Sequence, residues 1–306
     1  MTLTVKDIPE DIHVVSGQVI YVQGKDGSTV GPVSGADVTI VRGTKTLSRT
    51  TTDADGNFSL AGVPSGEYNI VVKVNTNPAK TVTAKLVLTT EDKDVQMSAI
   101  KVRTEDINSE LDVSQIPFDI VVGGLDRLAE SVFDNDEDAS SVTASMTIDQ
   151  PATDGNDPHQ KAIREKAGGK TLDLLNLALS VQGSDQQSGN TLELIIPYDT
   201  SRSGIKVYRS LLDANGKVIA EELADSAVEI GKQSGCIRLT IPADQLGLYA
   251  IGYTPASTGG GGSSVKKDDT VKSAGTGDMG LPPYAVMALG ACTGTVVLRF
   301  RRKRED

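Results

Sequence analysis

Between residues 13 and 102, apolar and polar side chains alternate in short runs separated by turn residues. In the run 36–41, for example, Ala36, Val38 and Ile40 fall on one face, as expected for a half-buried strand. The alternation predicts seven strands: 13–22, 36–41, 46–51, 58–60, 68–74, 80–88 and 94–102. Strands of this number and spacing predict a small β-sandwich over residues 13–103.

Residues 104–254 predict a second β-rich module with one short helix. The helix is expected over His159–Ala167, because Asn156-Asp157-Pro158 is a start signal and Gly168-Gly169 a stop signal. Strands are predicted at 118–122, 141–148, 170–181, 191–197, 205–212, 236–242 and 248–253. The acidic run 134–138 is expected to be a solvated loop between strands rather than a calcium site.

The C-terminus carries a different pattern. Residues 279–298 contain no charged side chain, and as a helix they would span roughly 30 Å, the thickness of a bilayer core. Four arginines and a lysine follow within residues 299–306, which predicts a cytoplasmic C-terminus. We therefore predict a transmembrane helix at 279–298 and a basic cytoplasmic tail at 299–306. Everything before residue 279 would then lie outside the cell.

The segment before this helix, 255–278, is polar and contains four successive glycines followed by two serines. It is expected to be a flexible linker. Residues 1–12 are expected to be a linker or the end of a preceding module. Met1–Asp7 lacks the basic and apolar regions of a signal peptide, so we expect further residues upstream of this chain.

Composition and motif spacing argue against nucleic-acid, zinc and calcium binding. The formal net charge is −11 although the tail is basic, and an acidic body of this kind excludes phosphate-driven nucleic-acid binding. Two histidines are too few for a zinc site built on histidine, and both are expected at the surface. Asp53, Asp55 and Asn57 begin like a calcium loop, but the twelfth position is Pro64, so a hairpin turn is favoured.

Sequence signatures of catalysis are missing. The chain has no G-x-S-x-G elbow and no phosphate-binding G-x-x-x-x-G-K-[ST] loop. Cys236 lies in an alternating strand and is expected in the core. Tyr198, Tyr208, Tyr249 and Tyr253 could line a ligand pocket of the second module or equally belong to its core edges. We predict no enzyme activity, no catalytic residues, no metal site and no cofactor.

Two resemblances follow from these motifs. The order Thr276-Gly277-Asp278, apolar span and Arg/Lys-rich tail resembles the LPxTG-type cell-wall sorting signal of Gram-positive surface proteins, with Ser273-Ala274 in place of Leu-Pro. The resemblance implies that a sortase would cleave between Thr276 and Gly277 and join Thr276 to peptidoglycan. An uncleaved membrane anchor is the alternative.

The second resemblance lies in residues 14–100. Thr51–Phe58 and Gly62–Tyr68, with their Asp-Gly and Pro-Ser-Gly turns, resemble the carboxypeptidase regulatory-like, transthyretin-like sandwich, a relative of the B-type repeats of collagen adhesins. This family implies a structural module without catalytic residues. The Lys–Asn crosslink of some adhesin relatives is not expected, because 17–22 has no lysine and position 72 is Val72 rather than glutamate.

The complete prediction is a mainly β protein: two β-sandwich-like modules in tandem, a linker and a C-terminal transmembrane helix. Its predicted function is a non-catalytic, surface-displayed stalk or adhesion module, anchored to cell wall or membrane. The alternative is the anchor region of a larger extracellular enzyme, such as a glycan hydrolase, with its catalytic domain upstream. The expected partners are sortase and peptidoglycan, the membrane through residues 279–298, and a host glycan or matrix ligand.

Overall fold

The computed structural model describes residues 12–91, 94–136, 139–183, 190–231 and 235–254. These residues form four β-sheets and two short helices, so the protein is mainly β as predicted. The predicted linker, transmembrane helix and basic tail, with Thr276 and Gly277, lie outside the described residues. Within the described ranges, neither helix is long and apolar enough to cross a membrane.

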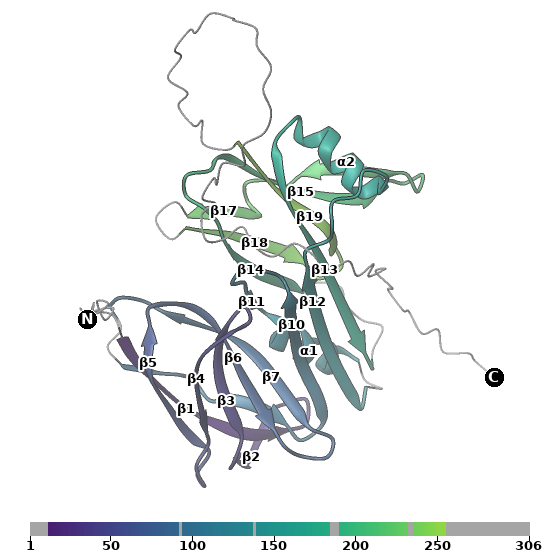
Figure 1. Cartoon of the computed structure of the whole chain (residues 1–306). Coiled ribbons are helices and arrows are strands. Elements are labelled where there is room, and N and C mark those ends of the chain that lie inside the picture. The colour runs from purple at the N-terminus through teal and green to yellow at the C-terminus, as the bar shows by residue number, and fades with distance from the viewer. Residues whose placement is uncertain (1–11, 92–93, 137–138, 184–189, 232–234, 255–306) are drawn as a thin grey trace, which may run out of the picture.

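The first nine strands form what we call the N-terminal unit (Figure 1). β1 forms four ladders, because its first half pairs with β5 and β8 and its second half with β2 and β9. The second sheet has the order β4-β3-β6-β7. The strands are β1 (Ile12–Gln23), β2 (Ser28–Pro32), β3 (Asp37–Arg42), β4 (Lys45–Thr51), β5 (Asn57–Pro64), β6 (Gly66–Val74), β7 (Lys80–Leu88), β8 (Asp94–Gln96) and β9 (Ile100–Arg103).

Alternation explains the core of this unit. Tyr68, Ile70, Val72 and Val74 of β6 point inward and are buried against Val15, Val19 and Phe58 from the facing sheet. The hydroxyl of Tyr68 donates to the carbonyl of Pro64 at 2.9 Å, which fixes the turn between β5 and β6. Most outward positions of β6 and β7 are polar, with Val71 and Val87 as the exceptions.

The remaining elements form the C-terminal unit. Its larger sheet has the order β10-β12-β13-β19-β15-β16 and its smaller sheet the order β11-β14-β18-β17. Buried aliphatic side chains from both sheets fill the space between them. The strands are β10 (Asp106–Gln115), β11 (Val121–Gly123), β12 (Ser141–Asp149), β13 (Thr171–Gln182), β14 (Thr191–Pro197), β15 (Ser203–Leu212), β16 (Val218–Glu222), β17 (Val228–Gly231), β18 (Cys236–Pro242) and β19 (Gly247–Thr254).

Two helices belong to this unit, whereas the sequence predicted one. α1 (Leu125–Asn135) buries Leu125, Leu128, Ala129, Val132 and Phe133 in the core. α2 (Pro158–Ala167) is the predicted helix, and it packs on β15, β16 and β19 through the small cluster around Ile163 and Tyr208. It begins at Asp157, whose side chain accepts from the Gln160 amide, and ends at Gly168 in the left-handed conformation.

Several predicted elements need correction. Residues 134–135, expected in a loop, are the last residues of α1, and only 121–122 of the predicted strand 118–122 are strand. The predicted strand 94–102 divides into β8 and β9, while β2, β10, β16 and β17 were not predicted. His13, expected at the surface, is 2% exposed in β1. Cys236 is buried in β18, as predicted.

Candidate functional site: the joint between the two units

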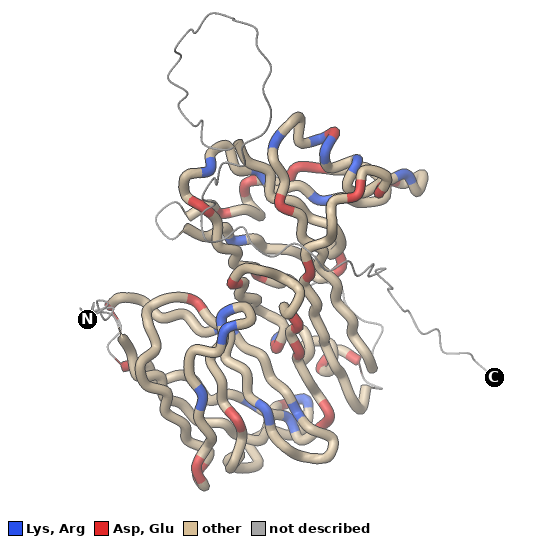
Figure 2. Tube along the Cα trace, in the orientation of Figure 1, with Lys and Arg blue, Asp and Glu red and all other residues tan. Residues whose placement is uncertain are grey.

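The most extensive polar arrangement in the described chain lies where the two units meet, which we call the joint. In Figure 1, α1 and β10 lie beside β7 of the N-terminal unit, and the short strand β11 lies beside β6 and β7. Figure 2 shows acidic and basic positions close together along this junction. The polar residues on the outward face of β6 and β7 meet polar groups of the other unit.

Two edge strands cap each other in the joint. β7 ends one sheet and β10 ends another, and edges of this kind leave backbone groups unpaired. The Thr81 amide donates to Asn108 Oδ1 at 2.8 Å, and the Thr83 amide donates to Ser109 Oγ at 2.8 Å. The Thr83 hydroxyl donates to the Ser109 carbonyl at 3.0 Å. Side chains of β10 thus satisfy β7 where a further strand would otherwise be needed.

A second edge is capped by one asparagine. Asn69 of β6 is 1% exposed, and its side chain faces the short edge strand β11. Asn69 Nδ2 donates to the Val122 carbonyl at 2.5 Å, and the Val122 amide donates to Asn69 Oδ1 at 3.1 Å. The side-chain amide therefore replaces a neighbouring peptide group and fixes the register of the two units.

The β3–β4 hairpin makes a third contact. Its Gly43, with φ of 57°, donates its amide to the Ile120 carbonyl at 3.0 Å. A Cβ at this glycine would lie 2.8 Å from the Cα of Asp119, closer than real contacts allow. Lys45 pairs with the Asp119 carboxylate at 2.9 Å. Only glycine accommodates both the backbone conformation and the close approach.

Four charged side chains close a ring across the joint. Glu67 and Lys85 come from the N-terminal unit, and Glu193 and Arg238 from the C-terminal unit. Lys85 lies 2.8 Å from Glu193 and 3.9 Å from Glu67, while Arg238 lies 3.3 Å from Glu193 and is also paired with Glu67. Each cation thus contacts both anions, so the ring needs both units in place.

The ring changes the titration of Glu193. Partial burial acts to raise the pKa of Glu193, but the hydrogen bond and charge of Lys85 and the charge of Arg238 outweigh it. The pKa of Glu193 therefore lies below its ordinary value. The Glu193 carboxylate stays ionised at neutral pH, so it keeps its ion pairs with Lys85 and Arg238.

Two cations of the N-terminal unit hold the end of α1. Lys25 Nζ donates to the Asp136 carbonyl at 3.0 Å, and Arg103 contacts the Asp134 carboxylate at 3.1 Å. Both cations also lie over the Phe133 ring, at 6.0 and 5.2 Å from its centroid. Positive charge at a helix C-terminus is stabilising, because the carbonyl ends carry partial negative charge. One unit thus completes a helix of the other.

The connection between the units is only two residues long, Thr104 and Glu105, and it is tied down at several points. The Thr104 amide donates to the Val22 carbonyl at 2.8 Å, and the Glu105 side chain accepts from the Gly24 amide at 2.7 Å. Buried Lys80 donates to the Glu105 carbonyl at 2.6 Å. A short connection with these bonds leaves little freedom for the units to rotate.

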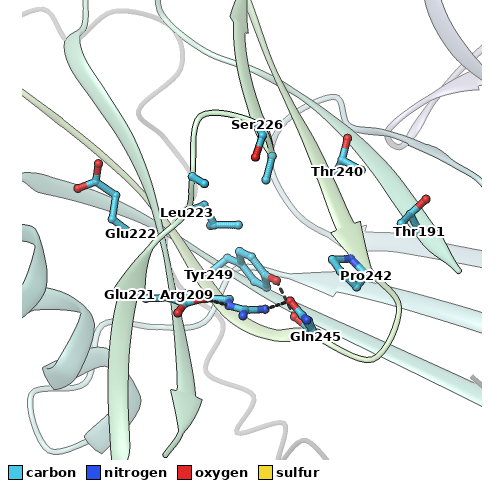
Figure 3. A pocket seen from close by; sticks show the side chains of 12 residues that line it. Thr191, Arg209, Glu221, Glu222, Leu223, Ser226, Thr240, Pro242, Gln245 and Tyr249 are labelled. Atoms are coloured by element: carbon cyan, nitrogen blue, oxygen red, sulfur yellow. Dashed lines mark hydrogen bonds and ion pairs between the residues drawn. The ribbon is translucent and has the colours of Figure 1, made fainter. Parts of the chain in front are cut away.

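An open pocket of about 420 Å³ lies at the side of the C-terminal unit (Figure 3). Its charged side chains are already paired: Arg209 with Glu221 at 2.5 Å and also with Gln245, and Glu222 with Lys206 at 2.7 Å. Tyr249 is buried beneath them and donates to the Gln245 carbonyl at 2.6 Å. No unmet charge or exposed aromatic face specifies a ligand in this pocket.

The described chain also gives no support for a catalytic constellation. His13 Nε2 lies 2.7 Å from Ser65 Oγ, but His13 Nδ1 has no hydrogen-bond partner, so the pair lacks the third group of a triad. His159 bonds Ser210 at 3.0 Å, far along the chain from that pair. Within the described ranges, no three His, Cys, Asp or Glu residues are placed to hold a metal ion.

Sequence reasoning missed the joint altogether. A polar residue at an outward strand position, such as Asn69 or Thr83, looks like a solvated residue, although both are buried here. One available signal was the short spacing between the strand ending at Arg103 and the polar stretch that begins at Asp106. Of the four tyrosines considered for a ligand pocket, Tyr208 and Tyr249 are buried in the core, and Tyr198 and Tyr253 are half-buried at its edge.

Solved structures with some likeness include a 9R-lipoxygenase from Cyanothece PCC8801, the major pilin subunit BcpA of Bacillus cereus and the major pilin SpaD of Corynebacterium diphtheriae. Their identities are 14%, 11% and 9%, over 39%, 79% and 83% of this chain. The chain spans 20% of the lipoxygenase and 58% of each pilin chain. TM-scores of 0.20, 0.22 and 0.22 are too low to carry an argument about this chain.

The comparison with family models is more specific, although no curated protein matches the chain. Residues 14–107 match the carboxypeptidase regulatory-like domain, which agrees with the resemblance found in residues 14–100. The match covers less than half of the chain and ends just past the connection between the units. Residues 14–107 are therefore similar to a carboxypeptidase regulatory-like domain.

Proposed function

We propose that this chain is a non-catalytic structural segment of a bacterial surface protein, in which the two units form one stiff body that positions whatever the protein displays. The observation that carries the proposal is the joint. In the joint, backbone edges and charged side chains of each unit find partners in the other unit. The similarity of residues 14–107 to the carboxypeptidase regulatory-like domain supports the same proposal, because that resemblance implies a structural module without catalytic residues.

Stiffness can be tested directly in solution. Small-angle X-ray scattering of residues 12–254 is expected to fit a single rigid shape that matches the described arrangement. Two independently moving units would give a broader distribution of dimensions. A scattering curve that requires such a mixture would overturn the stiff-body proposal, whatever the anchoring of the chain.

The second part of the proposal is display and anchoring through the C-terminus. Its support is the sequence order of Thr276-Gly277, the uncharged run 279–298 and the basic tail. The chain, preceded by a signal peptide, would be expressed in a Gram-positive host that has sortase. Cell fractions would be treated with hot detergent and then with a peptidoglycan hydrolase.

If Thr276 is attached to the wall, the wild-type protein should be released by the hydrolase and not by detergent. The Thr276→Ala variant should instead be extracted by detergent. Ser263→Ala, in the same polar segment, is the matched control and should behave as wild type. Detergent extraction of all three proteins would support an uncleaved membrane anchor and reject sortase attachment. Recovery in the soluble cytoplasmic fraction would overturn surface display.

A further inference from the structure

A narrow crevice inside the joint is lined by two acidic side chains of α1. It has a volume of about 20 Å³ and lies between β7 and β9 of one unit and β10 and α1 of the other. Asp126 and Glu130, four residues apart on α1, face it from one side. Lys101 and Arg103 face it from β9.

The two carboxylates are poorly compensated. Neither forms an ion pair within the described part of the chain. Arg103 is 6% exposed, but its guanidinium is directed to the Asp134 carboxylate at 3.1 Å and to the Gly24 carbonyl at 2.5 Å. Its Nε has no hydrogen-bond partner. Lys101 is exposed, so water screens its charge.

The other walls supply no further charge. β7 contributes Val82, and β10 contributes Ile107, Asn108 and Ser109. The polar atoms Asn108 Oδ1 and Ser109 Oγ already accept the Thr81 and Thr83 amides. Closing the joint therefore removes part of the water from these two half-buried carboxylates without giving them an ion-pair partner from the other unit, which disfavours their charged forms.

We propose that Asp126 and Glu130 make the joint acid-tightened, so that the two units dock more firmly as the surroundings become acidic. The titration agrees with the geometry. Burial raises the pKa of Glu130, an effect that the charge of Arg103 only partly offsets and that Asp126 reinforces. Burial also raises the pKa of Asp126 above its ordinary value, against the opposing effect of the Arg127 amide.

The sign follows from these directions. A carboxyl group whose pKa is raised by docking opposes docking while it is ionised, at pH above the raised pKa. That opposition fades as the pH falls through the raised pKa toward the ordinary values of about 3.9 for Asp and 4.3 for Glu. The charge ring weakens only below about pH 4.3, since the pKa of Glu193 is lowered, so the two effects separate in pH.

Hydrogen exchange provides a local readout. The Thr81 and Thr83 amides are bonded only across the joint, whereas the Val19 amide donates to the Gly56 carbonyl at 2.8 Å within the N-terminal unit. Protection factors measured by NMR between about pH 7 and about pH 5 should rise at Thr81 and Thr83 relative to Val19. The full rise of about tenfold for each unit of total pKa displacement is reached only near the ordinary pKa values, so by about pH 5 part of it is expected.

Variants decide whether these carboxylates are the cause. Glu130→Gln should raise protection at Thr81 and Thr83 at neutral pH and reduce its pH dependence, and the double variant with Asp126→Asn should abolish that dependence. Glu165→Gln, an exposed helical glutamate of α2, is the control and should match wild type. The negative charge of Asp126 also stabilises the N-terminus of α1 through the helix dipole, so Asp126→Asn changes two effects at once. The pH dependence of the double variant, rather than its protection at one pH, is therefore the quantity to compare.

The inference rests on the docked joint of the proposed function, and the two can fail separately. If Thr81 and Thr83 exchange as unprotected amides at every pH, the joint itself is wrong. Protection that is strong but unaffected by pH or by Glu130→Gln would overturn only the acid-tightened joint. Lower protection in Glu130→Gln at neutral pH would also overturn it, because the charge would then be stabilising.

Discussion

Replacing Asn69 with alanine should separate the joint from the rest of the fold. The Val122 amide and carbonyl bond the Asn69 side chain at 3.1 and 2.5 Å, and Val122 is only 1% exposed. The substitution therefore leaves both buried backbone groups without their partner. Leaving a buried donor or acceptor without a partner costs about 1–3 kcal/mol. Two such groups, partly relieved by water, predict a loss of about 2–5 kcal/mol in the free energy of unfolding.

Urea denaturation of residues 12–254, followed by circular dichroism, would measure this loss. Lys73→Ala is the matched control, because Lys73 lies four residues further along β6 on the same outward face and is exposed. It should change the free energy of unfolding by less than about 0.5 kcal/mol. A loss for Asn69→Ala that is no larger than that of Lys73→Ala would refute the claim that the side-chain amide secures the joint.

Two further changes test other parts of the joint. Gly43→Ala should lower the free energy of unfolding by about 1–3 kcal/mol more than Gly27→Ala does. Both glycines have positive φ, but of the two only Gly43 lies against the backbone of another segment. Equal losses in urea unfolding would mean that the hairpin contact is dispensable. Glu193→Gln should cost no more than about 1 kcal/mol at neutral pH, because the ring is part-exposed. Wild type should lose stability as the pH falls below about 4.3, because the Glu193 carboxylate, whose pKa is lowered, becomes protonated there. Glu193→Gln should reduce this loss. An unchanged dependence of stability on pH would argue against the ring.

The N-terminal unit was well predicted from sequence because its signals are local. Alternation fixes which apolar side chains of β3 and β6 point inward, and these side chains are buried. The Asp53 turn also follows from sequence, since its side chain accepts the Asp55 and Asn57 amides at 2.9 and 2.8 Å. β2 was missed because its five residues include Gly31 and Pro32, which are uncommon in strands.

The C-terminal unit shows two different failures. α1 has a helical apolar pattern at Leu125, Leu128, Val132 and Phe133, so its signal was present. What it lacks is a capping side chain, because it begins after Gly124. β10 is different: its residues are mostly polar, and its pairing is with β12, far along the chain. Only tertiary contacts make it a strand.

The joint could not be predicted for a more general reason. Polarity at an outward strand position predicts contact with water or with polar groups of another surface, and one sequence does not distinguish the two. Thr83 is 2% exposed and bonds Ser109, yet its place in the alternating pattern of β7 is the same as that of any solvated threonine. A polar interface between units therefore leaves a sequence pattern that resembles a surface.

This reasoning predicts that the N-terminal unit alone, residues 12–103, is less stable than the same unit within residues 12–254. Separation leaves the β7 edge uncapped, returns Asn69 to water and removes the Glu105 carbonyl that holds Lys80. Its core stays complete, so it should still fold. Calorimetry should show a lower midpoint for the isolated unit and one cooperative transition for the longer chain. Two separate transitions, with the first unit unfolding at its isolated midpoint, would mean that the joint contributes nothing to stability.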